Sequence, residues 1–192
     1  MTWTILVKTQ RGLERITASR IKELLGEGVS TISTPMGALG LVLVEGSGDV
    51  AESLNILKGE LLEAEKILPV EARVPANLDS ICRAAALAAA KFLKPDETFA
   101  VRTTRRGKHP FTSIDVNIRA GACIQKATGN PVNLDYPDKI VWVEIIGDKA
   151  YISVTEGSIE WRKTYPGKPS VIRMLSLITV AQVPYTGDLR AA

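Results

Sequence analysis

Hydrophobic positions in the first 75 residues switch between the short period of strands and the longer period of helices. Four short runs rich in apolar and β-branched residues predict strands, at residues 3–9, 29–34, 39–45 and 64–74. A helix is predicted after the first run, where apolar residues recur at helical spacing as far as Leu25 and Gly26 follows. A second helix is predicted over residues 49–58, with Asp49 as its N-cap and Gly59 at its end. The predicted order is strand, helix, strand, strand, helix, strand.

A new pattern begins after residues 75–77, where a proline is followed by an asparagine that can cap a helix. Apolar residues recur at helical spacing over residues 81–92, and many of them are alanines that allow a neighbouring element to approach closely. Residues 99–104 are strand-like. Two further strands are predicted over residues 140–146 and 150–154, with Gly147 and Asp148 as the tight turn between them.

Between these strands, Ser113 is placed to cap a helix that ends at Gly129. Its predicted inner face holds Ile114, Ile118 and Ile124, together with Gly121. Strands and helices thus alternate through this part of the chain, which predicts an α/β unit.

The elements together predict a chain of mixed α+β and α/β class with three parts. Residues 1–75 form a βαββαβ unit, which is the ferredoxin-like plan, and residues 76–156 form the α/β unit. Residues 157–192 hold a linker, an apolar run and the first turn of a helix without a cap. Such an incomplete strand and helix start cannot bury its apolar face. We therefore expect the sequence to be a piece of a longer chain.

Composition limits the chemistry that the chain can perform. Hydrophobic residues make up 45% and charged residues 23% of the 192 residues, which is typical of soluble globular proteins. No apolar run is long enough to cross a membrane and no secretory signal opens the sequence, so we expect a cytoplasmic protein with no membrane partner.

The inventory of reactive side chains is small. The sequence has one histidine and two cysteines, Cys82 and Cys123, which are too few and too far apart for a zinc knuckle or a disulfide framework. We expect both cysteines to be buried small apolar residues. A phosphate-binding loop of the G-x-x-x-x-G-K type is absent as well. No catalytic group, no metal site and no cofactor site is therefore expected in these residues.

Positive charge is concentrated in one part of the sequence. Residues 1–75 hold 8 Lys or Arg against 10 Asp or Glu, whereas residues 76–192 hold 16 against 11, so these parts carry −2 and +5. Residues 101–126 alone carry +5, because Asp115 opposes six cations. These cations are Arg102, Arg105, Arg106, Lys108, Arg119 and Lys126. Such clustering favours a polyanion, so nucleic-acid contact is the preferred interpretation and a solvated basic loop is the alternative.

Several neighbouring side chains can extend this surface. His109 and Phe111 are placed to stack on a base or a ribose, although packing in the core is favoured for Phe111. His109 has no acid or nucleophile partner, so acid–base catalysis is not expected of it. Arg119 can extend the basic face or can pair with Asp115, one helical turn before it.

A second cationic stretch lies near the end of the sequence. Arg162 and Lys163 follow Trp161, and this interleaving of rings and cations is typical of surfaces that bind single-stranded RNA. The alternative interpretation is a linker packed by Trp161.

Four patches, in order, resemble the THUMP domain, and the resemblance covers residues 77–154. The patches are FAVRTTRRGKHPF from Phe99, SIDVNIRAG from Ser113, VNLDYPD from Val132, and VEI from Val143 with AYI from Ala150. A ferredoxin-like unit typically precedes THUMP domains, so the order of the domains matches too.

The resemblance implies that the chain binds tRNA, at its 3′ acceptor end, for a catalytic domain or enzyme that modifies tRNA. Carried onto this sequence, it makes Arg105, Arg106 and Lys108 the leading RNA contacts. Asp138 is expected to be structural and to close the turn before the strand at Ile140.

Residues 178–192 are similar to the opening of the SPOUT-like RNA methyltransferase domain. Those enzymes bind S-adenosylmethionine in a C-terminal knot, for which these 192 residues have no room. The resemblance therefore implies methyl transfer only in a longer parent protein. A second hypothesis is a non-catalytic adaptor for tRNA cytidine acetylation, since that family combines the same two domains. A third is a protein-interaction domain with an incidental basic loop.

Overall fold

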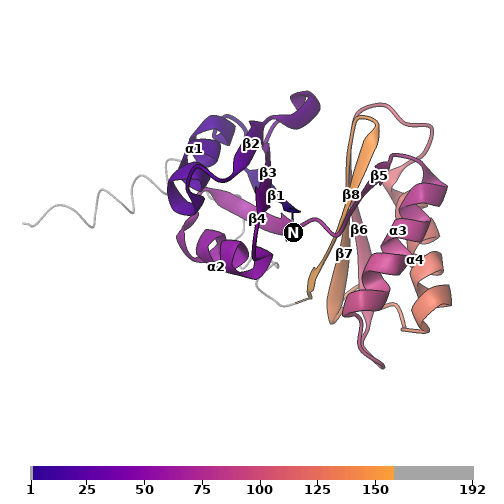
Figure 1. Cartoon of the computed structure of the whole chain (residues 1–192). Helices are drawn as coiled ribbons and strands as arrows, with labels where there is room; N and C mark the ends of the chain where they lie inside the picture. The colour runs from indigo at the N-terminus through magenta and orange to yellow at the C-terminus, as the bar shows by residue number, and fades with distance from the viewer. Residues whose placement is uncertain (1, 158–192) are drawn as a thin grey trace, which may run out of the picture. The chain divides into compact units, whose positions relative to one another are not determined.

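The computed structural model describes residues 2–157, which form two four-stranded sheets (Figure 1). The first sheet has the order β2-β3-β1-β4, and every neighbouring pair of strands in it is antiparallel. Its strands are β1 (Thr2–Thr9), β2 (Ser30–Ser33), β3 (Leu41–Ser47) and β4 (Ala64–Pro69). A short 3-10 helix, η1 (Pro35–Gly37), joins β2 to β3. Helices α1 (Glu14–Leu25) and α2 (Val50–Glu60) pack against one face of this sheet.

The second sheet has the order β5-β8-β7-β6, in which β6 and β7 are parallel and the other pairs are antiparallel. Its strands are β5 (Ala72–Pro75), β6 (Phe99–Arg106), β7 (Lys139–Ile146) and β8 (Lys149–Glu156). Helices α3 (Leu78–Phe92) and α4 (Ser113–Thr128) lie side by side on one of its faces (Figure 1).

The remaining faces of the two sheets share an apolar layer. Leu6 and Leu43 of the first sheet pack with Ile140, Trp142 and Ile146 of the second. Along each strand, the next residue points to the opposite face and packs against the helices instead, as Val141 and Val143 do in β7. Alternation along the strands thus supplies both a helix-covered core and a core between the sheets.

Most of the predicted elements are present, but the expected single strand over residues 64–74 is wrong. The chain forms β4 and β5 there, and these strands belong to different sheets. The Val70 N–H donates to the Thr4 carbonyl in the first sheet at 2.9 Å, and the next N–H, of Glu71, donates to Ile152 in the second at 2.8 Å. The segment predicted as one strand therefore contributes a strand to each of the two sheets. The expected helix end at Gly59 is also wrong, because α2 continues to Glu60.

The predicted inner face of α4 is wrong in part. Ile114 and Ile118 are 68% and 67% exposed, whereas Val116, Ala120 and Ile124 are buried. Both sets satisfy the helical period, and the set containing the smaller Ala120 faces the sheet. The cap is Thr112 rather than Ser113, because the Thr112 hydroxyl accepts the N–H of Asp115 at 3.2 Å.

Cys82 of α3 and Cys123 of α4 form a disulfide, with their Cα atoms 5.7 Å apart. Both residues are half-buried, so the prediction of two buried small apolar residues is wrong. The pairing depends on two helices lying side by side, and residues 41 positions apart give no sign of it in the sequence.

Asp138 links the start of β7 to the chain just before β6. Its carboxylate accepts hydrogen bonds from the backbone N–H and the hydroxyl of Thr98, both at 2.7 Å. These hydrogen bonds favour the ionised form and hold the pKa of Asp138 below its ordinary value. Asp138 thus has a structural role, but the expectation that it closes the turn before Ile140 is wrong, because its carboxylate bonds Thr98 instead.

Replacing Asp138 with asparagine is expected to lower the free energy of unfolding by about 1 kcal/mol at pH 7, since the exposed site screens the lost charge. A carboxyl with a lowered folded pKa stabilises the fold above its unfolded pKa, and that contribution is lost as the pH falls through the lower folded pKa. Urea unfolding between pH 7 and pH 2 should therefore show the difference from wild type shrinking. A difference that stays constant or grows toward low pH would contradict this role.

Candidate nucleic-acid interface

Three of the predicted basic residues, Arg102, Arg105 and Arg106, lie on β6, where they are divided between the two faces of the sheet. The strand extends to Arg106, so Arg105 and Arg106 are strand residues rather than loop residues. Arg105 points to the same face as Val101, which packs under the helices. Arg102 and Arg106 point to the face that is turned toward the first sheet. Cations that are adjacent in the sequence therefore do not form one continuous patch.

Arg106 contacts a buried carboxylate between the sheets. Glu144 of β7 is 1% exposed, and one of its oxygens lies 3.3 Å from the Arg106 guanidinium. Its other oxygen pairs with Lys8 of β1, whose ammonium also donates to the Thr104 hydroxyl at 3.2 Å. This cluster, Lys8, Glu144 and Arg106, is called the ion triad below. Arg106 thus has a structural partner and is less free to bind an external anion.

His109 anchors the loop that follows β6. Its Nε2 lies 2.6 Å from the Gly147 carbonyl oxygen, so this nitrogen carries the proton and donates. Its Nδ1 lies 3.4 Å from an Arg105 nitrogen, which donates to it. Phe111 is buried, as favoured, and its ring centroid is 5.4 Å from that of His109. His109 therefore holds both the loop and the Arg105 guanidinium in place.

The other predicted cations are mostly exposed. Arg102 donates to the Leu134 carbonyl, and Arg119 pairs with Asp79 of α3 at 3.3 Å rather than with Asp115. Lys108 and Lys126 are exposed and make no ion pair with residues 2–157. Arg162 and Lys163 lie outside the described residues. Lys108 and Lys126 are accordingly the predicted contacts without an ion pair among residues 2–157, and Lys108 is the one that lies on the loop anchored by His109.

Gly147 is the point where three loops meet. A methyl group at its Cα would lie 2.3 Å from the Met36 side chain, and one at Gly107 would lie 3.5 Å from the Gly147 Cα. The loop at residues 34–40, the loop at residues 107–110 and the β7–β8 turn are therefore in contact. Residues 35–38 lie between two predicted strands, and the sequence predicts no functional role for them. The signal available there is a methionine at a turn position, where polar residues are usual.

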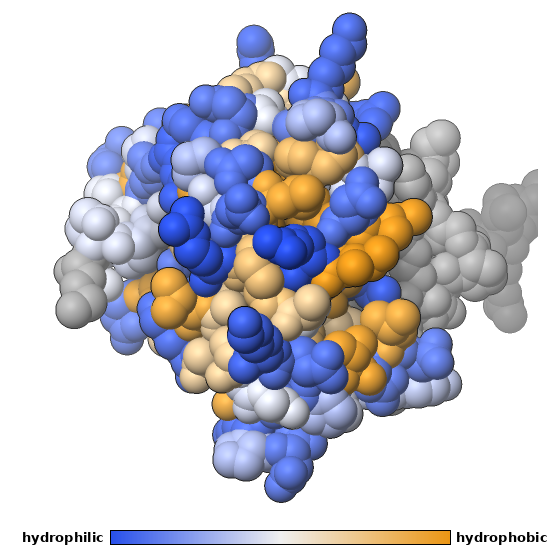
Figure 2. Space-filling view, turned by 90° about the vertical axis from the view of Figure 1, so that its right-hand side faces the viewer, coloured by the Kyte–Doolittle hydropathy of each residue, from blue (hydrophilic) through white to orange (hydrophobic). Residues whose placement is uncertain are grey.

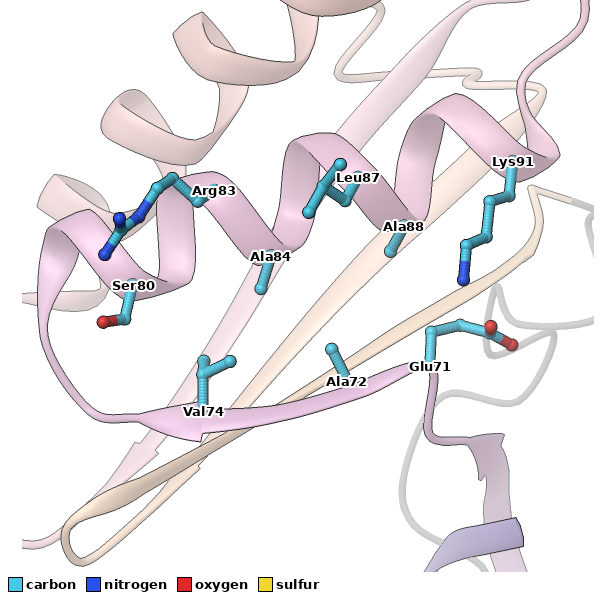
Figure 3. A pocket seen from close by; sticks show the side chains of 9 residues that line it. All are labelled: Glu71, Ala72, Val74, Ser80, Arg83, Ala84, Leu87, Ala88 and Lys91. Atoms are coloured by element: carbon cyan, nitrogen blue, oxygen red, sulfur yellow. The ribbon is translucent and has the colours of Figure 1, made fainter. Parts of the chain in front are cut away.

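Two other surfaces, both formed in part by α3, carry apolar side chains. Figure 2 shows apolar side chains among polar ones over the face formed by α3 and α4, where the exposed apolar residues include Leu87, Ile114 and Ile118. A groove of about 450 Å³ runs between β5 and α3 (Figure 3). Its floor is apolar, and Glu71 stands near Lys91 at its rim. Burial raises the pKa of Glu71, and the nearby Lys91 charge opposes that rise. Arg83 and Lys91 line the groove beside this one carboxylate, so cations are present there as well.

No helix within residues 2–157 is long and apolar enough to span a membrane. Among the same residues, no group of histidine, cysteine, aspartate or glutamate side chains is arranged to hold a metal ion.

Relatives of known sequence include three proteins of Methanocaldococcus jannaschii. Uncharacterized protein MJ0421 is 34% identical over 95% of this chain and 49% of its own length. A tRNA (guanine(6)-N2)-methyltransferase is 31% identical over 77% of this chain and 40% of its own length. A probable tRNA sulfurtransferase of the same organism is 45% identical over 31% of this chain and 16% of its own length. The chain thus spans half or less of the length of these relatives.

Solved structures and a family model agree on the fold. The crystal structure of TrmN from Thermus thermophilus has a TM-score of 0.64 and 26% identity, covering 94% of this chain and 55% of that one. None of these comparisons supports the SPOUT resemblance, which falls outside the described residues. The model of the THUMP domain matches residues 75–155. These residues, which include β6, α4 and the β7–β8 hairpin, are therefore a THUMP domain.

Proposed function

We propose that this chain is a tRNA-binding module that presents its RNA to a modification enzyme. The observation that carries the proposal is the THUMP domain at residues 75–155, because matching segments occur in a tRNA methyltransferase and in tRNA sulfurtransferases. Those two reactions differ in chemistry and share an RNA substrate. A segment common to both is best explained by recognition of the RNA.

Fewer observations support the finer features of the proposal. The antiparallel order β2-β3-β1-β4 supports a ferredoxin-like plan for the N-terminal unit. The 3′ acceptor end of tRNA, a cytoplasmic location and a methyl transfer that uses S-adenosylmethionine in a longer parent protein remain parts of the proposal. No class of catalytic domain is specified, since the comparisons give the SPOUT class no support.

Among the predicted contacts, Lys108 ranks first for binding phosphate. It is exposed, it lies in the loop anchored by His109, and it has no described carboxylate to displace. Arg102 is exposed as well, and Arg105 reaches the same loop through His109. Arg106 supports the strand from within the ion triad. A cation on an anchored loop loses little freedom when it binds an anion.

Replacing Lys108 with alanine is expected to weaken tRNA binding and to flatten its dependence on salt. Each phosphate contact releases condensed counterions, so the slope of log K against log salt should fall by about 0.7 to 0.9. Filter binding of tRNA over a series of salt concentrations measures both quantities.

Lys58 supplies the matched control, because it is also exposed but lies on α2, a helix that packs on the far face of the first sheet. The Lys58→Ala variant should retain the wild-type slope. Identical salt slopes for wild type, Lys58→Ala and Lys108→Ala would show that Lys108 does not contact RNA phosphate. Absence of any salt-dependent tRNA binding by the wild-type chain would overturn the proposed function itself.

A further inference from the structure

The loop at residues 34–40 exposes two large apolar side chains. Met36 is 60% exposed and Leu39 is 52% exposed. Exposed apolar residues that are scattered singly need no explanation. These two stand three positions apart on one loop, which joins β2 to β3 and meets the basic loop at Gly147.

The backbone of this loop is strained. Thr34 has φ 51° and ψ 56°, and Met36 has φ 51° and ψ 32°. Both are left-handed conformations that residues with a Cβ rarely adopt, least of all a β-branched threonine. Strain of this kind persists only where the surroundings enforce it, and it gathers at ligand sites.

Hydrogen bonds hold both ends of the loop. The buried Glu14 carboxylate accepts the N–H of Gly40 at 2.6 Å and that of Gly12 at 2.9 Å. Burial opposes ionisation of Glu14, but these N–H groups outweigh it and keep its pKa below the ordinary value. At the other end, the Thr34 N–H donates to the Leu41 carbonyl at 2.9 Å. The apolar side chains are therefore presented by a loop that is already ordered.

The same loop contacts the β7–β8 turn, next to the loop that carries Lys108. The Met36 side chain lies over Gly147, whose carbonyl accepts the His109 N–H at 2.6 Å. Lys108 is the residue before His109, and Gly107 borders Gly147. The loop that carries Met36 and Leu39 thus meets, at Gly147, the loop that carries Lys108, a cation with no ion pair among residues 2–157.

We propose that Met36 and Leu39 form an apolar seat for an unstacked base of RNA whose phosphate contacts Lys108. The inference rests on the proposed function and adds to it the side chains that cover an unpaired base. A base leaves its stack only if its flat face is covered again, and apolar side chains such as methionine and leucine cover or wedge against such faces. The polarisable thioether of Met36 suits contact with an aromatic ring. The adjoining cation favours RNA over an apolar protein segment as the ligand.

The test uses two RNA hairpins that differ only in an unpaired 3′ tail. The variant Met36→Ala/Leu39→Ala is compared with wild type and with Leu62→Ala, a control residue that is 74% exposed in the turn after α2. Fluorescence titration should show the double variant binding the tailed hairpin about tenfold more weakly. Binding of the blunt hairpin and the salt slope should not change, because no phosphate contact is lost. Leu62→Ala should match wild type with both RNAs.

A second variant tests whether the double substitution weakens binding only because it disturbs the loop. Met36→Gln keeps the length of the side chain but not its apolar character, and it should also weaken binding of the tailed hairpin only. Wild-type affinity of both variants for the tailed hairpin would overturn the inference, as would an equal loss for both hairpins. In either case the Lys108→Ala salt slope would still test the proposed function separately. Failure of the wild-type chain to bind either hairpin would overturn both.

Discussion

Replacing Glu144 with glutamine is expected to lower the free energy of unfolding by about 3 kcal/mol, because two cations then lose their buried partner. Lys8 and Arg106 have side chains only 14% and 31% exposed, so water cannot replace the carboxylate fully. The ion triad connects the two sheets, since Lys8 belongs to β1 and Arg106 to β6. Urea unfolding of the full chain, followed by circular dichroism, measures it.

The matched control is Glu45→Gln. Glu45 pairs with Arg73 at 3.5 Å, but both side chains are 43% exposed, so this change should cost less than about 1 kcal/mol. Adding Lys8→Met to Glu144→Gln should restore part of the loss, because one unpaired cation is removed. Equal effects of the Glu144 and Glu45 changes would show that the ion triad does not hold the sheets together.

Reducing the disulfide between Cys82 and Cys123 is expected to lower the free energy of unfolding by about 2 to 4 kcal/mol. A link between residues 41 positions apart restricts the unfolded chain, and reduction removes that restriction while leaving α3 and α4 packed. Urea unfolding with and without a thiol reductant should therefore give two well-separated midpoints.

The Cys82→Ala/Cys123→Ala variant provides the control. It should unfold near the midpoint of the reduced wild-type chain and should not respond to reductant, because alanines cannot form the bond. A wild-type midpoint that reductant leaves unchanged would mean that the bond does not form in solution or does not constrain the unfolded chain.

Local signals in the sequence predicted much of the fold. Asp49 and Asn77 cap their helices as expected, since each side chain accepts a nearby backbone N–H. The β7–β8 hairpin turns at Gly147 and Asp148, as the glycine and its flanking apolar runs indicated. Each of these features is decided by a few adjacent residues.

Features decided by distant residues could not be predicted in this way. Residues 64–74 were predicted as one strand, and pairing with strands elsewhere in the chain decides that the segment divides between two sheets. Nothing near Ile114 indicates that Val116 faces the sheet in its place. Likewise, the partner of Cys82 becomes visible only once two helices are placed together.

The candidate site also combines features decided by adjacent residues with features decided by distant ones. The excess of cations in residues 101–126 was evident from counting, and the exposed Lys108 agrees with the expectation of a free cation. Arg106 has its carboxylate 38 positions away on β7, beyond the reach of any count along the chain. The contribution of Met36 was hidden for a similar reason, because its loop meets the basic loop only through Gly147.

Side chains alternate between the two faces of β6, so the register of this strand is itself a constraint on the sequence. One residue inserted after Val101 would send each later side chain to the opposite side. The Arg106 guanidinium, which pairs with Glu144, would then point toward the alanines and valines under the helices, and the Arg105 guanidinium beside His109 would point toward the first sheet. We would therefore expect relatives to vary the composition of this strand more readily than its length.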